Sequence, residues 1–293
     1  MSVTVAREID AAPDAARRET GLLRRALGQA RARVGLVLAG LVVLVALVGP
    51  VVAPYAGTET VGEPFQAQGG QAILGTDNLG RDVFSRFLWG GRTVLALAVL
   101  CTAVGVAIGA FVGLVAGYTR TWVDGLLARL GDIVLAFPQV VLALLFLAVW
   151  GPHPWVIVAA IGLAHAPRTA RTVRSAVLGV AERDHVEAAE AIGLRRWRVR
   201  LADVVPNIAG PLLTETGRRF AYSVALVTGL GVVGLGVQPP VAGWGLMIHE
   251  NLAAMAVRPW PVLLPAIAIG LLAAGVSLLG DGIARGCEQG GME

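Results

Sequence analysis

The chain has 293 residues, of which 56% are hydrophobic and only 15% are charged, with a mean hydropathy of +0.70. A soluble domain carries about 25% charged residues, and these apolar residues fall in long runs that a water-facing surface could not hide, which argues against a soluble protein. All 24 basic residues are arginine, which excludes a Walker A nucleotide site or a Schiff-base enzyme, since both need lysine. If the protein uses ATP, another chain must bind it.

The N-terminal segment, residues 1–33, is polar and holds seven arginines against four acids. The first apolar run, residues 34–52, follows at once. A signal peptide has a short basic leader and an apolar core of about 7–15 residues, and both segments here are longer. We therefore expect residues 34–52 to be a retained membrane span.

Five further runs have the length needed to cross a bilayer, for which about 20 apolar residues are required. Together with the first run they predict an all-α polytopic membrane protein with six transmembrane helices. The five runs are residues 94–118, 130–150, 155–170, 221–237 and 260–280.

The distribution of arginine predicts the orientation, because cytoplasmic loops carry an excess of basic residues. Residues 168–203 hold eight arginines against five acids, whereas residues 54–92 hold three against four and residues 238–259 hold one arginine. The first of these segments is therefore expected in the cytoplasm and the other two outside. This orientation places both termini in the cytoplasm.

The second predicted span carries glycine at every fourth position, which keeps these residues on one helical face where a neighbouring helix can approach closely. We interpret this face as a packing surface and not a ligand site. A second, less regular group in the fifth span favours close packing over a loosened, gate-like helix. The first group is Gly105, Gly109, Gly113 and Gly117, and the second is Gly229, Gly231, Gly234 and Gly236.

The predicted cytoplasmic loop at residues 184–207 has the pattern of two short helices joined at a glycine. Asp184 is a candidate N-cap with Glu187 as its capping-box partner, and Gly193 bends the chain. A basic amphipathic turn follows, and Pro206 is expected to stop it. Such a knob fits the groove of another protein, or it lies as a basic loop on anionic lipid; the residues alone leave both interpretations open.

The residues Glu187, Ala188, Ala189, Gly193 and, further on, Pro206 resemble the EAA loop of ABC-importer permeases. In that family the loop is the coupling helix that docks into a cleft of the ATP-binding subunit. The resemblance implies a coupling role for these residues and for Arg195 and Trp197 in the basic turn.

A second motif lies at residues 74–86, with the sequence LGTDNLGRDVFSR, followed by Trp89-Gly90 and Arg92. It resembles the external segment of the C-type permease subunit of dipeptide, oligopeptide and nickel importers. Arg81 and Asp82 could pair with each other or with a docking partner. The motif either orders the loop or receives the substrate-binding protein. Its candidate docking residues are Gly75, Thr76, Asp77, Gly80, Arg81, Asp82 and Arg86.

Three shorter segments are similar to the same family, namely LGDIVLAFP at 130–138, GLGVQPP at 234–240 with Trp244-Gly245, and LGDGIAR at 279–285. The resemblance covers residues 30–285. It divides the chain into a cytoplasmic segment (1–33), a first span with its external loop (34–92), a transmembrane domain (93–285) and a cytoplasmic tail (286–293). That tail, GCEQGGME, departs from the Asp-Pro-Arg ending frequent in the family.

The resemblance implies a type I ABC-importer permease in the bacterial inner membrane that forms half of a translocation pathway. Its implied partners are a homologous second permease, two cytoplasmic ATP-binding subunits that carry ATP and Mg, an external substrate-binding protein and membrane lipid, with no nucleic acid. This chain is expected to be no enzyme and to bind no cofactor. The implied cargo is a di- or oligopeptide, with nickel, metallophore or glutathione-like solutes as alternatives.

Charged residues near the start of the fifth span are unusual for that family. Arg218 and Arg219 are expected at the cytoplasmic interface, snorkelling or paired with Glu215; a cavity-facing role in substrate recognition stays open.

Two other classes of function have candidate residues in the sequence. A membrane hydrolase would need a Ser–His pair, for which Ser223, Ser277 and His165 are the candidates. An ion-coupled transporter would use charged relays within spans, where Asp132 and Asp281 are the candidates. No metal site is predicted, because His153, His185 and His249 are scattered over opposite membrane faces.

Overall fold

A computed structural model describes residues 29–70, 72–119, 122–181 and 196–290. The described part is helical, without a regular β-strand; three isolated β-bridges lie in the loop before α3. The helices are α2 (Ala30–Val52), α3 (Val83–Thr119), α4 (Trp122–Ala136), α5 (Gln139–Trp150), α6 (Pro154–Ala181), α8 (Arg196–Val232), α9 (Trp244–Asn251), the 3₁₀ turn η1 (Leu252–Ala254) and α10 (Trp260–Gly290).

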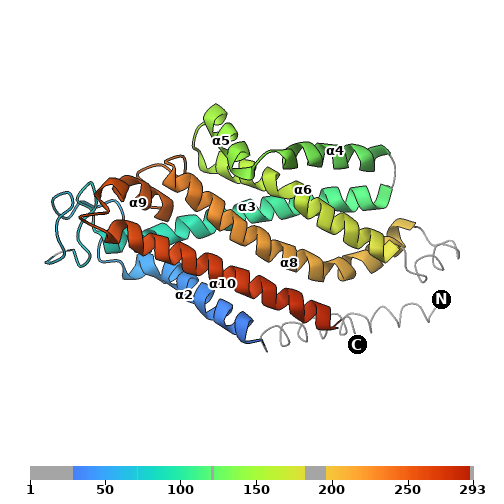
Figure 1. The fold of residues 1–293 in the computed structure, drawn as a ribbon, viewed down its shortest axis with the longest axis horizontal. Coiled ribbons are helices and arrows are strands. Elements are labelled where there is room, and N and C mark those ends of the chain that lie inside the picture. Colours follow the sequence, from blue (N-terminus) through green and yellow to red (C-terminus); the bar gives the residue numbers. More distant parts are fainter. Residues whose placement is uncertain (1–28, 71, 120–121, 182–195, 291–293) are drawn as a thin grey trace.

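The long helices lie roughly along one axis (Figure 1). The loop of residues 53–82 and the short helix α9 gather at one end of the bundle, which we call the loop end. The beginning of α2 and the end of α10 lie toward the opposite end. The most extensive helix contacts are between α3 and α6 and between α2 and α10.

Three helices, α2, α3 and α10, are long and apolar enough to cross a membrane. The bent pair of α4 and α5 makes a fourth candidate if it counts as one span. The helices α6 and α8 carry several arginines and are not among these candidates. The described residues therefore make a multi-helix membrane protein in which apolar length alone supports three or four crossings of the six predicted.

The third predicted span, residues 130–150, is not one helix, and this prediction was wrong. The chain bends by 87° between α4 and α5, with the break at Phe137 and Pro138. Proline has no backbone N–H and disfavours the helical conformation of the residue before it, so a helix ends readily at this position. Pro138 is extended, at φ −56° and ψ 131°, and α5 starts at the next residue.

The second predicted span begins eleven residues too late, because α3 starts at Val83 and not at residue 94. The Asp82 side chain accepts hydrogen bonds from the backbone N–H and the hydroxyl of Ser85, at 2.8 and 2.6 Å. This is the N-cap arrangement that satisfies the free donors of a helix's first turn. The predicted external loop of residues 54–92 therefore ends at Asp82, and Arg86 and Trp89 lie on α3.

The predicted stop at Pro206 was also wrong, since α8 continues through this residue from Arg196 to Val232. A proline removes one intrahelical hydrogen bond, and long membrane helices tolerate that loss; Pro167 and Pro265 likewise lie inside α6 and α10.

At its other end, α8 stops five residues before the predicted limit at residue 237. Gly234 there has φ +88°, and the N–H of Leu235 bonds the carbonyl of Leu230 at 2.9 Å. This glycine-terminated closure is a Schellman motif.

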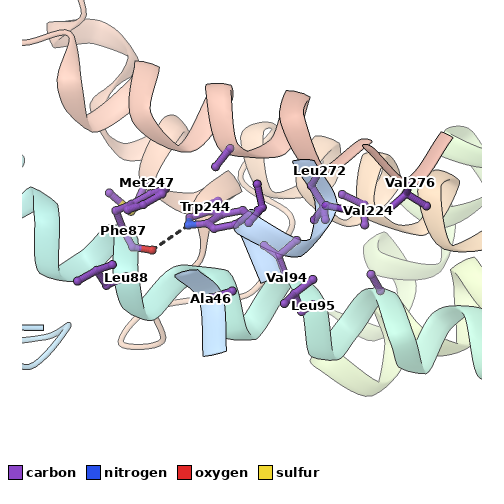
Figure 2. Close-up of a cluster of buried hydrophobic side chains, with 14 of the residues drawn as sticks. Ala46, Phe87, Leu88, Val94, Leu95, Val224, Trp244, Met247, Leu272 and Val276 are labelled. Atoms are coloured by element: carbon purple, nitrogen blue, oxygen red, sulfur yellow. Dashed lines mark hydrogen bonds between the residues drawn. The ribbon is translucent and has the colours of Figure 1, made fainter. Parts of the chain in front are cut away.

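The core at the loop end is built around Trp244, the first residue of α9 (Figure 2). The indole is fully buried, stacks on Phe87 of α3 with ring centroids 5.5 Å apart, and donates a hydrogen bond to the Phe87 carbonyl at 2.9 Å. A Cβ on Gly91 would lie 2.7 Å from the indole, so only glycine leaves room for the ring at that position. The same cluster takes in apolar residues of α2, α8 and α10, which ties four helices to α9.

Candidate functional site

The motif at residues 74–86 folds into a compact loop that is held by its own backbone. The Thr76 hydroxyl donates to the carbonyl of Glu63 at 2.5 Å and accepts from the N–H of Gln66 at 2.7 Å. Gly75 and Gly80 have φ +81° and +73°, a region that other residues rarely adopt. A Cβ on Gly75 would also approach the Gln66 carbonyl to 2.6 Å. The glycines of the motif are therefore required by the backbone path.

Four charged side chains form a buried network between this motif and α9. Asp77 Oδ2 lies 2.8 Å from Arg81 Nε and 2.6 Å from Arg86 Nη1. Glu250 Oε2 on α9 lies 2.9 Å from Arg81 Nη2 and 2.6 Å from Arg86 Nη1. The two carboxylates thus bridge the same two guanidinium groups.

The network is balanced, with two negative and two positive charges. Its side chains are 0–11% exposed, so each charge has lost most of its water and depends on the others. The second oxygen of Asp77 accepts the N–H groups of Leu79 and Arg81 at 2.8 and 2.9 Å. Removing any one member would leave an uncompensated charge in a place that water does not reach.

The network joins two segments that are far apart in the chain, since 169 residues separate Arg81 from Glu250. Next to it, the side-chain oxygen of Asn251 accepts the N–H of Asn78 at 3.0 Å, while its amide nitrogen donates to the carbonyl of Met247. Loop 53–82 is therefore pinned to α9 by ion pairs and by a hydrogen bond through Asn251.

The predicted docking residues mostly point inward. Arg81 and Asp82 do not pair with each other, because Arg81 binds Asp77 and Glu250 while Asp82 caps α3. The residues whose side chains make internal contacts in this way, each residue at most 5% exposed, are Thr76, Asp77, Arg81, Asp82 and Arg86.

Glu250, Asn251 and Trp244 complete the site, and none of them was among the predicted site residues. No signal in the sequence pointed to the first, since Asp77 and Asp82 already balance Arg81 and Arg86 within the motif. Only the structure shows that Asp82 caps α3 and leaves the two arginines with one aspartate. Which acid supplies the missing charge depends on the fold, because Glu250 comes from α9.

The four glycines of α3 face α6. A Cβ on Gly105, Gly109, Gly113 or Gly117 would come within 2.5–2.8 Å of His165, Thr169, the Ala170 carbonyl and Val177 respectively. Such distances leave no space for a side chain, so the two helices approach at the closest range over about three turns. In the fifth predicted span, Gly231 and Gly236 pack backbone against backbone, Gly234 forms the turn after α8, and Gly229 faces open space.

The predicted coupling segment lies largely outside the described residues. This applies to Glu187, Ala188, Ala189, Gly193 and Arg195. Trp197 and Pro206 fall on the first part of α8.

A Ser–His contact does exist between α6 and α8. Nε2 of His165 lies 3.1 Å from the Ser223 hydroxyl, which accepts a hydrogen bond from Thr102 of α3 at 3.0 Å. Both His165 and Ser223 are fully buried, and Nδ1 of His165 has no partner among the described residues. A hydrolase needs an accessible serine and a group that orients the base. This geometry instead joins three helices.

Residues 105–289 match the family model of binding-protein-dependent transport system inner membrane components. The match covers more than half of the chain. The chain belongs to this family. It is therefore a multi-pass ABC-importer permease of the bacterial inner membrane, in accord with the resemblance of its two long motifs.

Curated permeases of known or assigned cargo align with this chain over most of their own length. A dipeptide transport system permease, DppC, from Alkalihalophilus pseudofirmus is 32% identical over 85% of this chain and 83% of its own. A di/tripeptide permease from Pseudomonas aeruginosa is 35% identical over 85% and 84%. A glutathione permease, GsiD, from Pectobacterium atrosepticum is 34% identical over 72% and 70%.

Solved transporters share the permease fold at low sequence identity. An amino acid ABC transporter with histidines aligns with a TM-score of 0.54 at 18% identity, covering 67% of this chain and 91% of its own. An inward-facing methionine ABC transporter aligns with a TM-score of 0.56 at 18% identity, covering 68% and 95%. The fold is therefore that of ABC-importer permeases.

Proposed function

We propose that this chain is one of two permease subunits of an ATP-driven importer of di- or oligopeptides. The observation that carries the cargo is that two relatives above 30% identity, which match more than four fifths of this chain, are permeases for dipeptides and for di- or tripeptides. Glutathione is the second candidate, because a glutathione permease matches a shorter part of the chain at similar identity. Nickel and metallophores are less favoured cargo candidates than either of these.

In the proposed topology the chain crosses the membrane six times, with α2, α3, the bent α4–α5 pair, α6, α8 and α10 as the spans. The loop end faces outward and both termini face the cytoplasm, as the arginine distribution favours. The arginines of α6 and α8 then lie toward the cytoplasmic half or between helices, where charges in membrane proteins find partners.

The pinned loop is proposed to be the platform that receives an external substrate-binding protein. Its internal network would hold the surface in one shape, and exposed neighbours such as Ile73, Leu79 and Glu63 would make the contacts. Gly75, Thr76, Asp77, Gly80, Arg81, Asp82 and Arg86 thus shape the platform from inside.

Import would be powered by two cytoplasmic ATP-binding subunits that carry ATP and Mg. The segment at residues 184–207 would seat in them, with Glu187, Ala188, Ala189, Gly193, Arg195 and Trp197 at the contact and Pro206 on α8. Closure of the ATP-binding subunits would move α8 and switch the two permeases between inward- and outward-open states. A homologous permease would supply the other half of the pathway.

The proposal is tested with the complete complex in proteoliposomes. ATP is supplied on the side of the membrane that carries the ATP-binding subunits, and uptake of labelled dipeptide is compared with uptake of labelled glutathione. We expect ATP-dependent uptake of dipeptide that exceeds uptake of glutathione. Replacing Gly193 with Trp should leave assembly intact but separate ATP hydrolysis from uptake. Wild-type uptake and wild-type ATPase activity in that assembled variant would contradict the coupling assignment, and preferred uptake of glutathione would reassign the cargo.

A further inference from the structure

Arg218 and Arg219 on α8 share a single carboxylate, that of Glu215. Nε of Arg219 lies 2.8 Å from Oε1 of Glu215, and Nη1 of Arg218 lies 3.9 Å from Oε2 of the same residue. Arg168 on α6 lies at the level of Arg219 on α8, because Arg168 is three residues beyond His165 and Arg219 is four residues before Ser223, the two residues that join these helices. We call Arg168, Arg218 and Arg219, together with Glu215, the arginine cluster.

The nearby acids of α4 are already occupied by other arginines. Asp132 forms an ion pair with Arg171, and Asp124 forms a two-pronged pair with Arg174 at 2.6 Å for each contact. Within the described ranges, Arg168 has no ion pair at all. Three positive charges and one negative charge leave the arginine cluster with a net charge of about +2.

The arginine cluster lies at one level of the bundle, well away from the loop end. Arg168 is 14 residues from the start of α6 and Arg219 is 13 residues from the end of α8, which places both about 20 Å along their helices at 1.5 Å per residue. A hydrocarbon core is about 30 Å thick. If these helix ends mark its boundary, the excess charge lies inside the membrane, where charges require a partner.

Arg219 has hydrogen-bonding capacity that the described chain leaves unused. Its side chain is 6% exposed and its Nη1 has no acceptor, and the contact of Nε with Glu215 lacks the alignment of a hydrogen bond. On the facing helix, the buried hydroxyl of Thr169 is also unpartnered. Thr169 follows His165 by four residues and Arg219 precedes Ser223 by four, so in antiparallel helices both lie one turn below the His165–Ser223 contact.

The cluster is open to the outside of the single chain. Arg168 is exposed, and the Arg218 side chain is 59% exposed. The ring of Tyr222, 48% exposed, lies over the Arg219 guanidinium at 5.1 Å. Tyr222 and Arg218 belong to an exposed stripe of α8 at helical spacing, whose further members are Ala225, Gly229 and Val233.

We propose that the arginine cluster is a carboxylate-binding station for the cargo, which receives the free C-terminal carboxylate of a peptide as it passes along the exposed stripe of α8. The proposal rests on the proposed peptide-import function. Guanidinium groups bind carboxylates through paired, charge-assisted hydrogen bonds, and one carboxylate lowers the net charge of the cluster from about +2 to about +1. The exposed guanidinium groups of Arg168 and Arg218 are the ones that the carboxylate can reach, and the buried Arg219 behind them, whose Nη1 has no acceptor in the described chain, adds to the positive charge that attracts it.

The test compares uptake of one labelled peptide with a free C-terminal carboxylate and the same peptide as its C-terminal amide. The complete complex is reconstituted with its binding protein at saturation, so that the binding protein's own preference is identical for every permease variant. We expect Arg168→Gln and Arg218→Gln to lower kcat/KM for the free acid about tenfold, the loss of one charge-assisted hydrogen bond, while kcat/KM for the amide stays unchanged. Arg219→Lys keeps the positive charge but loses the planar guanidinium that can bind a carboxylate through two parallel hydrogen bonds. Its kcat/KM for the free acid should lie between that of the Gln variants and that of wild type.

Arg171→Gln is the matched control, because Arg171 is an exposed arginine on the same helix that already has Asp132 as its partner. It should leave the ratio of acid to amide uptake at the wild-type value. An equal loss for both peptides, or no loss for either, would overturn the carboxylate station.

The same reconstituted complex distinguishes the cargo carboxylate from two other anions, a lipid phosphate and an acidic side chain of the partner permease. An effect present only in vesicles that contain anionic lipid would assign the cluster to a lipid phosphate, and loss of the second permease on size-exclusion chromatography would assign it to a partner's acid. Either result overturns the proposal while ATP-dependent peptide uptake by wild type persists. If the wild-type complex takes up neither peptide with ATP, the proposed function itself fails.

Discussion

Nη1 of Arg86, on α3, lies 2.6 Å from Oε2 of Glu250, on α9, although 164 residues separate the two in the chain. Glu250 is the acid that completes the charge balance of Asp77, Arg81 and Arg86 under loop 53–82. Because every one of these side chains is largely removed from water, the contact fixes where the loop sits on the bundle. The first prediction concerns this pair.

Glu250→Gln should lower the stability of the chain strongly. The substitution leaves two buried guanidinium groups with one carboxylate, and breaking a buried pair costs about 3–5 kcal/mol. The midpoint of thermal unfolding of the purified protein in detergent reports the change. Glu63→Gln is the control, since this exposed acid on the same loop should shift stability by less than about 0.5 kcal/mol. Equal midpoints for the two variants would show that the network carries no stability.

Trp244→Phe should destabilise the loop end through one lost hydrogen bond. The Phe87 carbonyl would lose the indole N–H at 2.9 Å and stay buried, a cost of about 1–3 kcal/mol. Thermal unfolding again measures the effect. Trp155→Phe removes an indole that is 63% exposed at the start of α6 and should have little influence. A larger shift for the Trp155 variant would contradict the assigned role of Trp244.

Gly109→Ala should disturb the contact between α3 and α6. The new Cβ would lie 2.5 Å from Cβ of Thr169 and 2.6 Å from the carbonyl of Ala166, and one of these elements would have to move. Overpacking of this kind costs about 1–3 kcal/mol. Gly125→Ala on α4 is the matched control, because nothing lies within 4 Å of its Cβ position. Fluorescence-detected size-exclusion profiles after heating compare the two; equal retention of the monodisperse peak would argue against close packing here.

Ser223→Ala should weaken the contact of three helices without removing any catalytic activity. His165 would lose its only hydrogen-bond partner among the described residues, at a cost of about 1–3 kcal/mol. We expect a lower unfolding midpoint than that of wild type. We also expect the measured rate of peptide or ester hydrolysis by the purified chain to be the same for the variant and for wild type. Ser277→Ala, at an exposed position of α10, serves as the control. Hydrolysis that disappears only with Ser223 would revive the hydrolase alternative.

Much of the fold could be predicted because the signals are local. Apolar runs identified α2, the apolar part of α3 and α10, and glycine at every fourth position identified the face of α3 that meets α6. The early start of α3 also had a local signal, since Asp82 is followed three residues later by Ser85 at the position that an N-cap uses. The break at Pro138 had one as well, because proline disfavours the helical conformation of the residue before it.

Only part of the candidate site could be predicted from the sequence. The motif at residues 74–86 pointed to its glycines, arginines and acids, but whether these side chains face outward or inward is not a local property. The docking interpretation and the structural interpretation were therefore equally compatible with the residues. Burial of Asp77 and Arg86 at 0% and 1% exposure is what assigns them to the interior.

The sequence by itself determined the class of the protein, since apolar length, arginine asymmetry and long family motifs are written in consecutive residues. Only the tertiary structure decided which charges meet. Arg86 and Glu250 are brought together by the packing of α9 against α3 around Trp244, and Arg168 is brought to the level of Arg219 by the antiparallel packing of α6 and α8. The physical reason is that a buried charge takes its partner from whatever lies next to it in space, and spatial neighbours are set by the packing of whole helices.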